Sequence, residues 1–225
     1  TDPIVAGLGV PVPCAGDDAQ APPASVTEVV DRLSALAPDS VACLVASLPR
    51  PLPLEATDDV FSAQPAVGAR SPRLFVQYPG LTLTVVPEGP GASLVELGEA
   101  DPSHPGLTIK AELAFPLDLS PTGPLDPMAP YDRVVDGEGT RCGVCHPGEV
   151  EVRDGVFASV PFQPLSTRRV PIDAVRAEAE ACPDALDPGG TDDRCALLRA
   201  VFGGGPVFHA PFPADTPTIY DPPAL

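Results

Sequence analysis

Proline is the feature that most constrains the fold of this chain. The 225 residues include 33 prolines and 20 glycines, together nearly a quarter of the sequence. Proline has no backbone N–H, so it interrupts a helix interior and the hydrogen-bond ladder of a central strand. Frequent prolines therefore predict short helices and strands joined by long, ordered connections. They argue against a helical bundle and against a doubly wound parallel α/β sheet.

The charge balance restricts the partners of the chain. Its net charge is −18, and Lys110 is the single lysine. A chain this acidic repels phosphates, which argues against nucleic acid and anionic membrane surfaces as partners. No apolar run approaches the roughly 20 residues that a membrane-spanning helix needs, so we expect no direct membrane span. A protein partner with a basic docking face fits this charge better.

Helix signals occur near both ends of the sequence. Ser25-Val26-Thr27-Glu28 has the pattern of a capping box and predicts a helix that stops at Pro38. Residues 40–48 fit either a second short helix or a buried strand. Residues 171–182 and 192–202 are predicted to form two further helices.

The middle of the chain has the period of two that is typical of strands. On the segment 107–115, Lys110 and Glu112 alternate with apolar residues, as in a half-buried strand. Segments 149–152 and 156–160 predict a hairpin that turns at Asp154-Gly155. We therefore expect an antiparallel, β-sandwich-like sheet. Its predicted strands before the hairpin are 74–78, 81–86, 93–97 and 107–115.

Four of the six cysteines fall into two neighbouring pairs, Cys14 with Cys43 and Cys182 with Cys195. We interpret both pairs as disulfides, with free buried thiols as the alternative. Disulfides indicate an oxidising compartment, and the chain begins at Thr1 rather than at methionine. The expected location is periplasmic or extracellular, after export and removal of a signal peptide.

The remaining two cysteines belong to the pentapeptide Cys142-Gly143-Val144-Cys145-His146. In this motif the chain resembles the c-type cytochromes. The resemblance implies one covalently bound haem c, with thioether bonds from Cys142 and Cys145 and with His146 as an iron ligand. Three other uses of the motif compete with haem: a dithiol redox site, a zinc site and a small structural disulfide.

The resemblance is confined to the motif, and it leaves the second iron ligand open. The chain offers three candidates: His209 in an apolar segment after Gly203–Gly205, Met128 just upstream of the motif, and His104 in a turn. An open iron or a ligand from another chain is the further alternative. Arg141 adjoins the motif, and its planar guanidinium suits a haem propionate.

Taken together, the sequence predicts an α+β protein with Pro-rich loops and two disulfides. Residues 1–49 form a disulfide-tethered arm and helix, 50–125 an antiparallel β region, and 126–225 a haem-bearing C-terminal region. The expected function is one-electron transfer by a monohaem c-type cytochrome-like protein. A first alternative is an accessory subunit of a larger respiratory, photosynthetic, membrane or envelope assembly or filament. A second is a haem enzyme or ligand sensor with an open iron.

Overall fold

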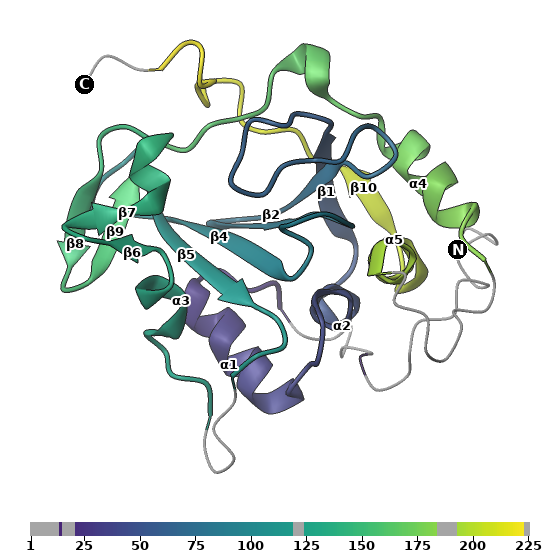
Figure 1. The fold of residues 1–225 in the computed structure, drawn as a ribbon, viewed down its shortest axis with the longest axis horizontal. Coiled ribbons are helices and arrows are strands. Elements are labelled where there is room, and N and C mark those ends of the chain that lie inside the picture. Colours follow the sequence, from purple (N-terminus) through teal and green to yellow (C-terminus); the bar gives the residue numbers. More distant parts are fainter. Residues whose placement is uncertain (1–13, 15–20, 119–123, 184–192, 223–225) are drawn as a thin grey trace.

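A computed structural model describes residues 14, 21–118, 124–183 and 193–222 (Figure 1). The fold is α+β and is built on one eight-stranded sheet with the order β10-β1-β2-β3-β4-β5-β9-β8. β10 runs parallel to β1, and all other neighbours are antiparallel. The strands are β1 Leu52–Thr57, β2 Arg73–Tyr78, β3 Leu81–Val85, β4 Leu94–Ala100, β5 Thr108–Ala114, β8 Val150–Arg153, β9 Val156–Ser159 and β10 Val207–His209.

Short helices and a two-stranded ribbon complete the described structure. The helices are α1 Val26–Leu36, α2 Val41–Ser47, α3 Ala129–Asp132, α4 Ile172–Glu180 and α5 Asp193–Gly203. Two 3-10 turns are η3 Arg141–Val144 and η4 Ser166–Arg168, and the ribbon pairs β6 Val135–Asp136 with β7 Gly139–Thr140.

Local capping explains where the first two helices begin. The Ser25 hydroxyl accepts a hydrogen bond from the Glu28 amide, and the Glu28 carboxylate accepts one from the Ala24 amide. The predicted capping box is therefore present, except that the Glu28 carboxylate accepts from the Ala24 amide instead of from the amide of the cap residue Ser25. The Ser40 hydroxyl caps α2 in the same way through the Cys43 amide. Residues 41–47 are therefore a helix rather than a strand.

One face of the sheet carries the hydrophobic core. Helices α1, α2 and α5 lie on this face (Figure 1). They bury side chains such as Leu33, Leu44 and Phe202 against alternate strand residues such as Leu74 and Leu83. This burial supplies most of the favourable free energy of folding.

The opposite face of the sheet is polar, yet it is also buried. Glu55, Lys110 and Glu112 are only 1%, 8% and 3% exposed. The loop after β1, the segment around η4 and the C-terminal segment cross over this face (Figure 1). The expectation of a half-buried strand at 107–115 was therefore wrong. Alternation shows which residues share a face but not what covers that face.

The predicted antiparallel sheet with short helices is confirmed, but the sandwich is not. The described strands form a single large sheet and a small ribbon. Helices provide the apolar layer that a second sheet would supply in a sandwich. Strands from the C-terminal region, β8, β9 and β10, join both edges of the same sheet. No helix in the described parts of the chain is both long and apolar enough to cross a bilayer.

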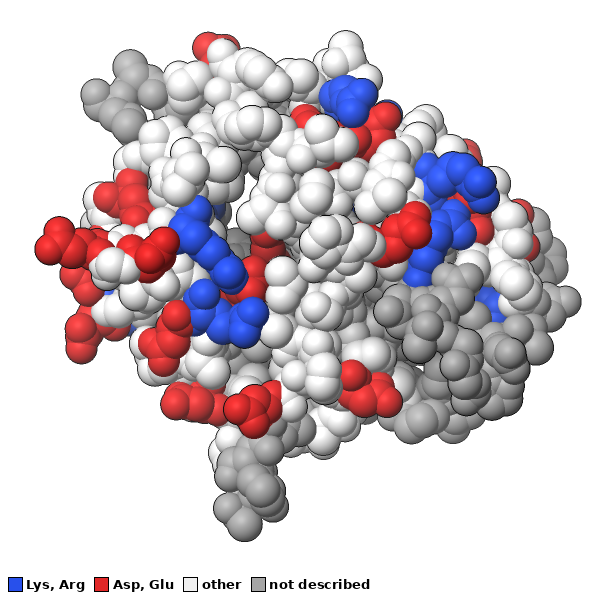
Figure 2. Space-filling model, viewed as in Figure 1, with Lys and Arg blue, Asp and Glu red and all other residues white. Residues whose placement is uncertain are grey.

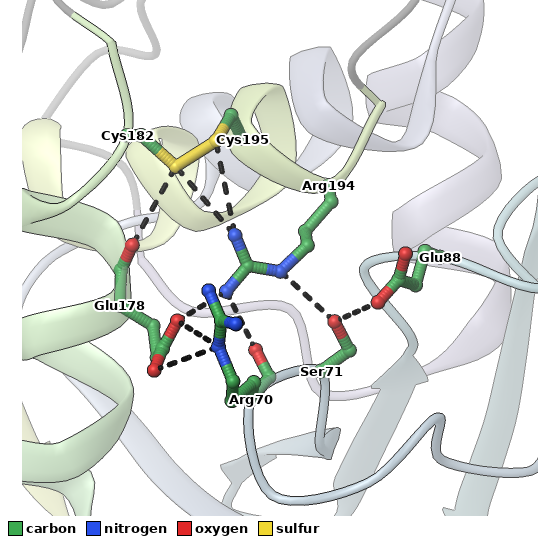
Figure 3. Close-up of polar contacts among 7 residues, drawn as sticks. All are labelled: Arg70, Ser71, Glu88, Glu178, Cys182, Arg194 and Cys195. Carbon is green, nitrogen blue, oxygen red and sulfur yellow. Dashed lines mark hydrogen bonds and ion pairs between the residues drawn. A yellow bond between two sulfur atoms is a disulfide. The ribbon is translucent and has the colours of Figure 1, made fainter.

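Both predicted disulfides are present. Cys14 and Cys43 have Cα atoms 4.9 Å apart, and Cys182 and Cys195 have Cα atoms 5.6 Å apart. The second disulfide links the end of α4 to α5 (Figure 3). The many prolines keep the helices short. The disulfides stabilise the fold by restricting the unfolded chain.

An arginine network surrounds the second disulfide (Figure 3). Arg194 of α5 pairs with Glu178 of α4 at 2.6 Å and donates to the Ser71 hydroxyl at 2.9 Å. Arg70 pairs with the same carboxylate at 3.1 Å. The network therefore ties both helices to the loop that precedes β2.

Removing the Cys182–Cys195 disulfide should lower stability measurably. The bond closes a loop with a sequence separation of 13. For such a loop the double variant Cys182→Ala/Cys195→Ala should lose about 2–4 kcal/mol of unfolding free energy in urea. Arg70→Ala is the control, because its side chain is 79% exposed and the ion pair should contribute less than about 1 kcal/mol. Equal stability of the cysteine variant and the parent chain would contradict this role.

Candidate functional site

A cavity of about 200 Å³ lies on the polar face of the sheet. Its floor comes from β2 to β5, and its walls come from the loop after β1, the Cys142–His146 segment and residues 161–164. Figure 2 shows a hollow in this side of the molecule, with basic and acidic side chains next to each other at its edge. Aromatic side chains add apolar surface to the lining, among them Phe61, Phe75 and Phe162.

The Cys-Gly-Val-Cys-His motif forms a single helical turn in the cavity wall. The Thr140 hydroxyl caps the turn by accepting from the Cys142 and Gly143 amides at 3.1 and 3.3 Å. The Cys142 carbonyl then accepts from the amides of Cys145 and His146 at 3.0 and 2.9 Å. Residues one helical turn apart share a face. Accordingly Cys142, Cys145 and His146 all line the cavity.

Glu149 fixes the start of this turn through its contacts with Thr140. Its carboxylate accepts from the Thr140 amide at 2.8 Å and contacts the Thr140 hydroxyl. A side chain at Gly139 would collide with the same carboxylate, because an added Cβ would lie 2.4 Å from Oε1. At Gly143 that separation would be 3.1 Å. The two glycines therefore let Glu149 approach the motif closely.

The two cysteines of the motif are free thiols, since the disulfides use the other four. Burial, helped by the nearby Glu96 carboxylate, raises the pKa of the Cys142 thiol. A raised pKa disfavours the thiolate, which is the reactive form in a dithiol redox site. Among the described residues, the motif belongs to no cluster of three or more side chains placed to hold a metal ion. The described residues therefore provide no set of four protein ligands for zinc at the motif.

His146 is oriented by two contacts. Its Nδ1 atom lies 2.8 Å from the Val160 carbonyl, and its ring stacks on Phe162 with centroids 5.2 Å apart. A carbonyl only accepts, so Nδ1 carries the proton and Nε2 holds the free lone pair. Nε2 has no hydrogen-bond partner in the parts of the chain that the structure describes. This is the arrangement by which proteins prepare a histidine to bind a metal.

Burial also keeps the His146 imidazole neutral. It lowers the pKa of His146 to about 4, with a smaller contribution from the charge of Lys110. Only a neutral imidazole has a lone pair for a metal. The ring is therefore ready to act as a ligand at neutral pH.

Two acidic side chains face each other on the cavity floor, and arginines neutralise them. Glu96 and Glu112 are cross-strand partners in β4 and β5. Arg73 pairs with Glu96 at 2.5 Å, and Arg133 and Arg141 pair with Glu112 at 3.0 and 2.5 Å. Arg141 thus lines the cavity beside the motif, with its guanidinium on Glu112.

Lys110 is a cavity residue that sequence reasoning missed as part of a site. It is 8% exposed, and its amine donates to the Thr108 hydroxyl at 2.6 Å. Burial lowers the pKa of Lys110 to about 8. The nearby Cys142 and Glu96 side chains raise the pKa, but their effect is smaller than that of burial. The available signal was the single lysine of a strongly acidic chain, on the polar side of a predicted strand.

The three candidates for a second iron ligand all lie outside this cavity. His209 is on β10, where its Nε2 atom is 3.2 Å from the buried Glu55 carboxylate in a different cavity. His104 pairs with Asp101 at 2.7 Å in a turn. Met128 packs against the core just before α3. The structure brings together Cys142, Cys145, His146 and Arg141, but it does not bring these three candidates to them.

Comparison of the chain with protein-family models, with curated proteins and with solved structures found no match.

The cofactor-free chain should show the depressed pKa of His146 directly. Its ring should titrate near pH 4 by NMR, whereas an exposed histidine titrates near pH ~6.5. Between these values the unfolded chain binds a proton that the folded chain does not. Lowering the pH through this window should therefore reduce the unfolding free energy, and His146→Phe should remove that part of the dependence. A ring that titrates at the ordinary value would contradict the burial of His146.

Proposed function

We propose that this chain is an extracytoplasmic monohaem c-type cytochrome-like protein that carries out one-electron transfer. The observation that carries the proposal is the joint exposure of two free thiols and one oriented imidazole to a single cavity. Cys142 and Cys145 would hold haem c through thioether bonds, and His146 would bind its iron. When bound, the haem would supply an iron that accepts one electron from a donor protein and passes it to an acceptor.

The donor set fits such a group in kind and in protonation state. Neither thiol is in a disulfide, as addition to vinyl groups requires, and burial raises the pKa of the Cys142 thiol. The imidazole is neutral and presents Nε2 through its Nδ1 bond to the Val160 carbonyl. Apolar rings such as Phe162 and Phe75 would provide surface for the macrocycle, and two cationic side chains, Arg73 and Arg141, also line the cavity. The buried Arg73 Nε has no hydrogen-bond partner among the described residues, which fits a missing anionic acceptor.

The remaining features of the chain support an exported electron carrier. Two disulfides favour an oxidising compartment. Val144, between the two cysteines, is 88% exposed, so the motif lies at the protein surface. Electron transfer between proteins needs such closeness of the redox group to the surface. A net charge of −18 would steer the chain to a redox partner, or to a site in a membrane or envelope assembly, with a basic face.

Intact mass spectrometry tests the proposal. Chain exported by a host with haem-attachment machinery should exceed the polypeptide mass by one haem, roughly 616 Da. The variant Cys142→Ala/Cys145→Ala should lose this added mass and the Soret absorption. Val144→Ala is the matched control, because this exposed side chain stands between the cysteines and should not affect attachment.

A polypeptide-only mass and no Soret band in the parent chain would overturn the haem proposal. That result would favour the accessory-subunit alternative instead.

A further inference from the structure

Among the described residues that line the cavity, two side chains have a nitrogen that can coordinate iron. One is His146, and the other is Lys110. The arginines that line it stay protonated and have no free lone pair. His209, His104 and Met128 lie in other parts of the molecule. A second protein ligand from within this cavity would therefore come from β5.

The register of the sheet leaves space around the Lys110 amine. Lys110 pairs with Gly98 of β4, which in turn pairs with Thr82 of β3. All three residues line the cavity. Gly98 has no side chain, and a Cβ built there would come no closer than 3.9 Å to a neighbour, at Thr108. The floor is thus open beside the Thr108 hydroxyl to which the Lys110 amine donates.

The Lys110 amine also has unused bonding capacity. An ammonium group has three donors, and among the described residues this one has a single hydrogen-bond partner, the Thr108 hydroxyl. Burial of a cation with so few partners is costly. The amine is near enough to Cys142 and His146 for charge to be felt between them. A neutral amine bound to a metal would remove the cost of that buried charge.

We infer that Lys110 binds the haem iron on the face opposite His146. The inference rests on the proposed covalent haem. The Lys110 ammonium releases its proton to solvent, and its nitrogen lone pair forms the bond to iron. Iron then has nitrogen ligands on both sides, which suits electron transfer and closes the site to added ligands.

Two variants separate ligation from a purely electrostatic role. Lys110→Ala removes both the amine and its charge. Lys110→Arg keeps a cation that can pair with a propionate but cannot bind iron, because guanidinium does not lose its proton. His209→Ala is the matched control for loss of a candidate ligand outside the cavity. The intact mass of every variant is measured first, so that a failure of haem attachment is seen separately from a failure of ligation.

The expected result is a low-spin parent that does not bind carbon monoxide when reduced. Lys110→Ala and Lys110→Arg should both become high-spin and bind carbon monoxide stoichiometrically, while His209→Ala stays like the parent. The inference is overturned if the haem-loaded parent is already high-spin, or if both lysine variants stay low-spin. It is also overturned if Lys110→Arg alone stays low-spin, since charge would then explain the role of Lys110.

A measurement on the unaltered sequence covers the case in which the variants fail to fold. Because Lys110 is the single lysine, chain labelled with ¹⁵N-lysine gives one side-chain signal. In the reduced, haem-loaded protein, ligation should shift the side-chain resonances strongly upfield through the ring current of the macrocycle. Resonances near their ordinary positions would show that the amine is not a ligand.

Discussion

The burial of a charged sheet face is the constraint on which the rest of this structure depends. Charged and polar side chains are costly to remove from water unless partners replace it. Here Arg73 of β2 pairs with Glu96 of β4 across the intervening strand β3, and Glu112 pairs with both Arg133 and Arg141. Loops rather than an apolar layer cover this face, and they leave a cavity against it. The opposite face supplies the hydrophobic core through α1, α2 and α5.

Local features of this fold could be predicted from the sequence, because they depend on neighbouring residues. The Ser25 cap, the turn at Asp154-Gly155 and the two disulfides each involve segments close together in the chain. The single sheet could not be predicted in this way. Its order depends on long-range pairings, such as β10 beside β1 and β9 beside β5. Period-two alternation is the same in a sandwich and in a helix-backed sheet.

The same distinction holds for the candidate site. Cys142, Cys145 and His146 share a face because one helical turn dictates it, and the spacing alone predicts that. The orientation of His146 depends on Val160 and Phe162, which only the hairpin brings near. The choice of His209, His104 or Met128 as a second ligand relied on residue type without position. Lys110 lies in the cavity, opposite Gly98 in the register of β4 and β5. A single lysine belongs to no recognisable sequence motif, so the sequence did not mark it as a site residue.

A crystal structure of the exported chain tests the central claim most directly. The claim is that the polar face of the sheet is covered by loops in order to house a covalently bound planar cofactor. We expect a macrocycle in the cavity above β2 to β5, continuous with the sulfur atoms of Cys142 and Cys145 and bound by Nε2 of His146. A Cys142–Cys145 disulfide, with the loops closed onto Lys110 and Glu112 and no cofactor between them, would contradict it.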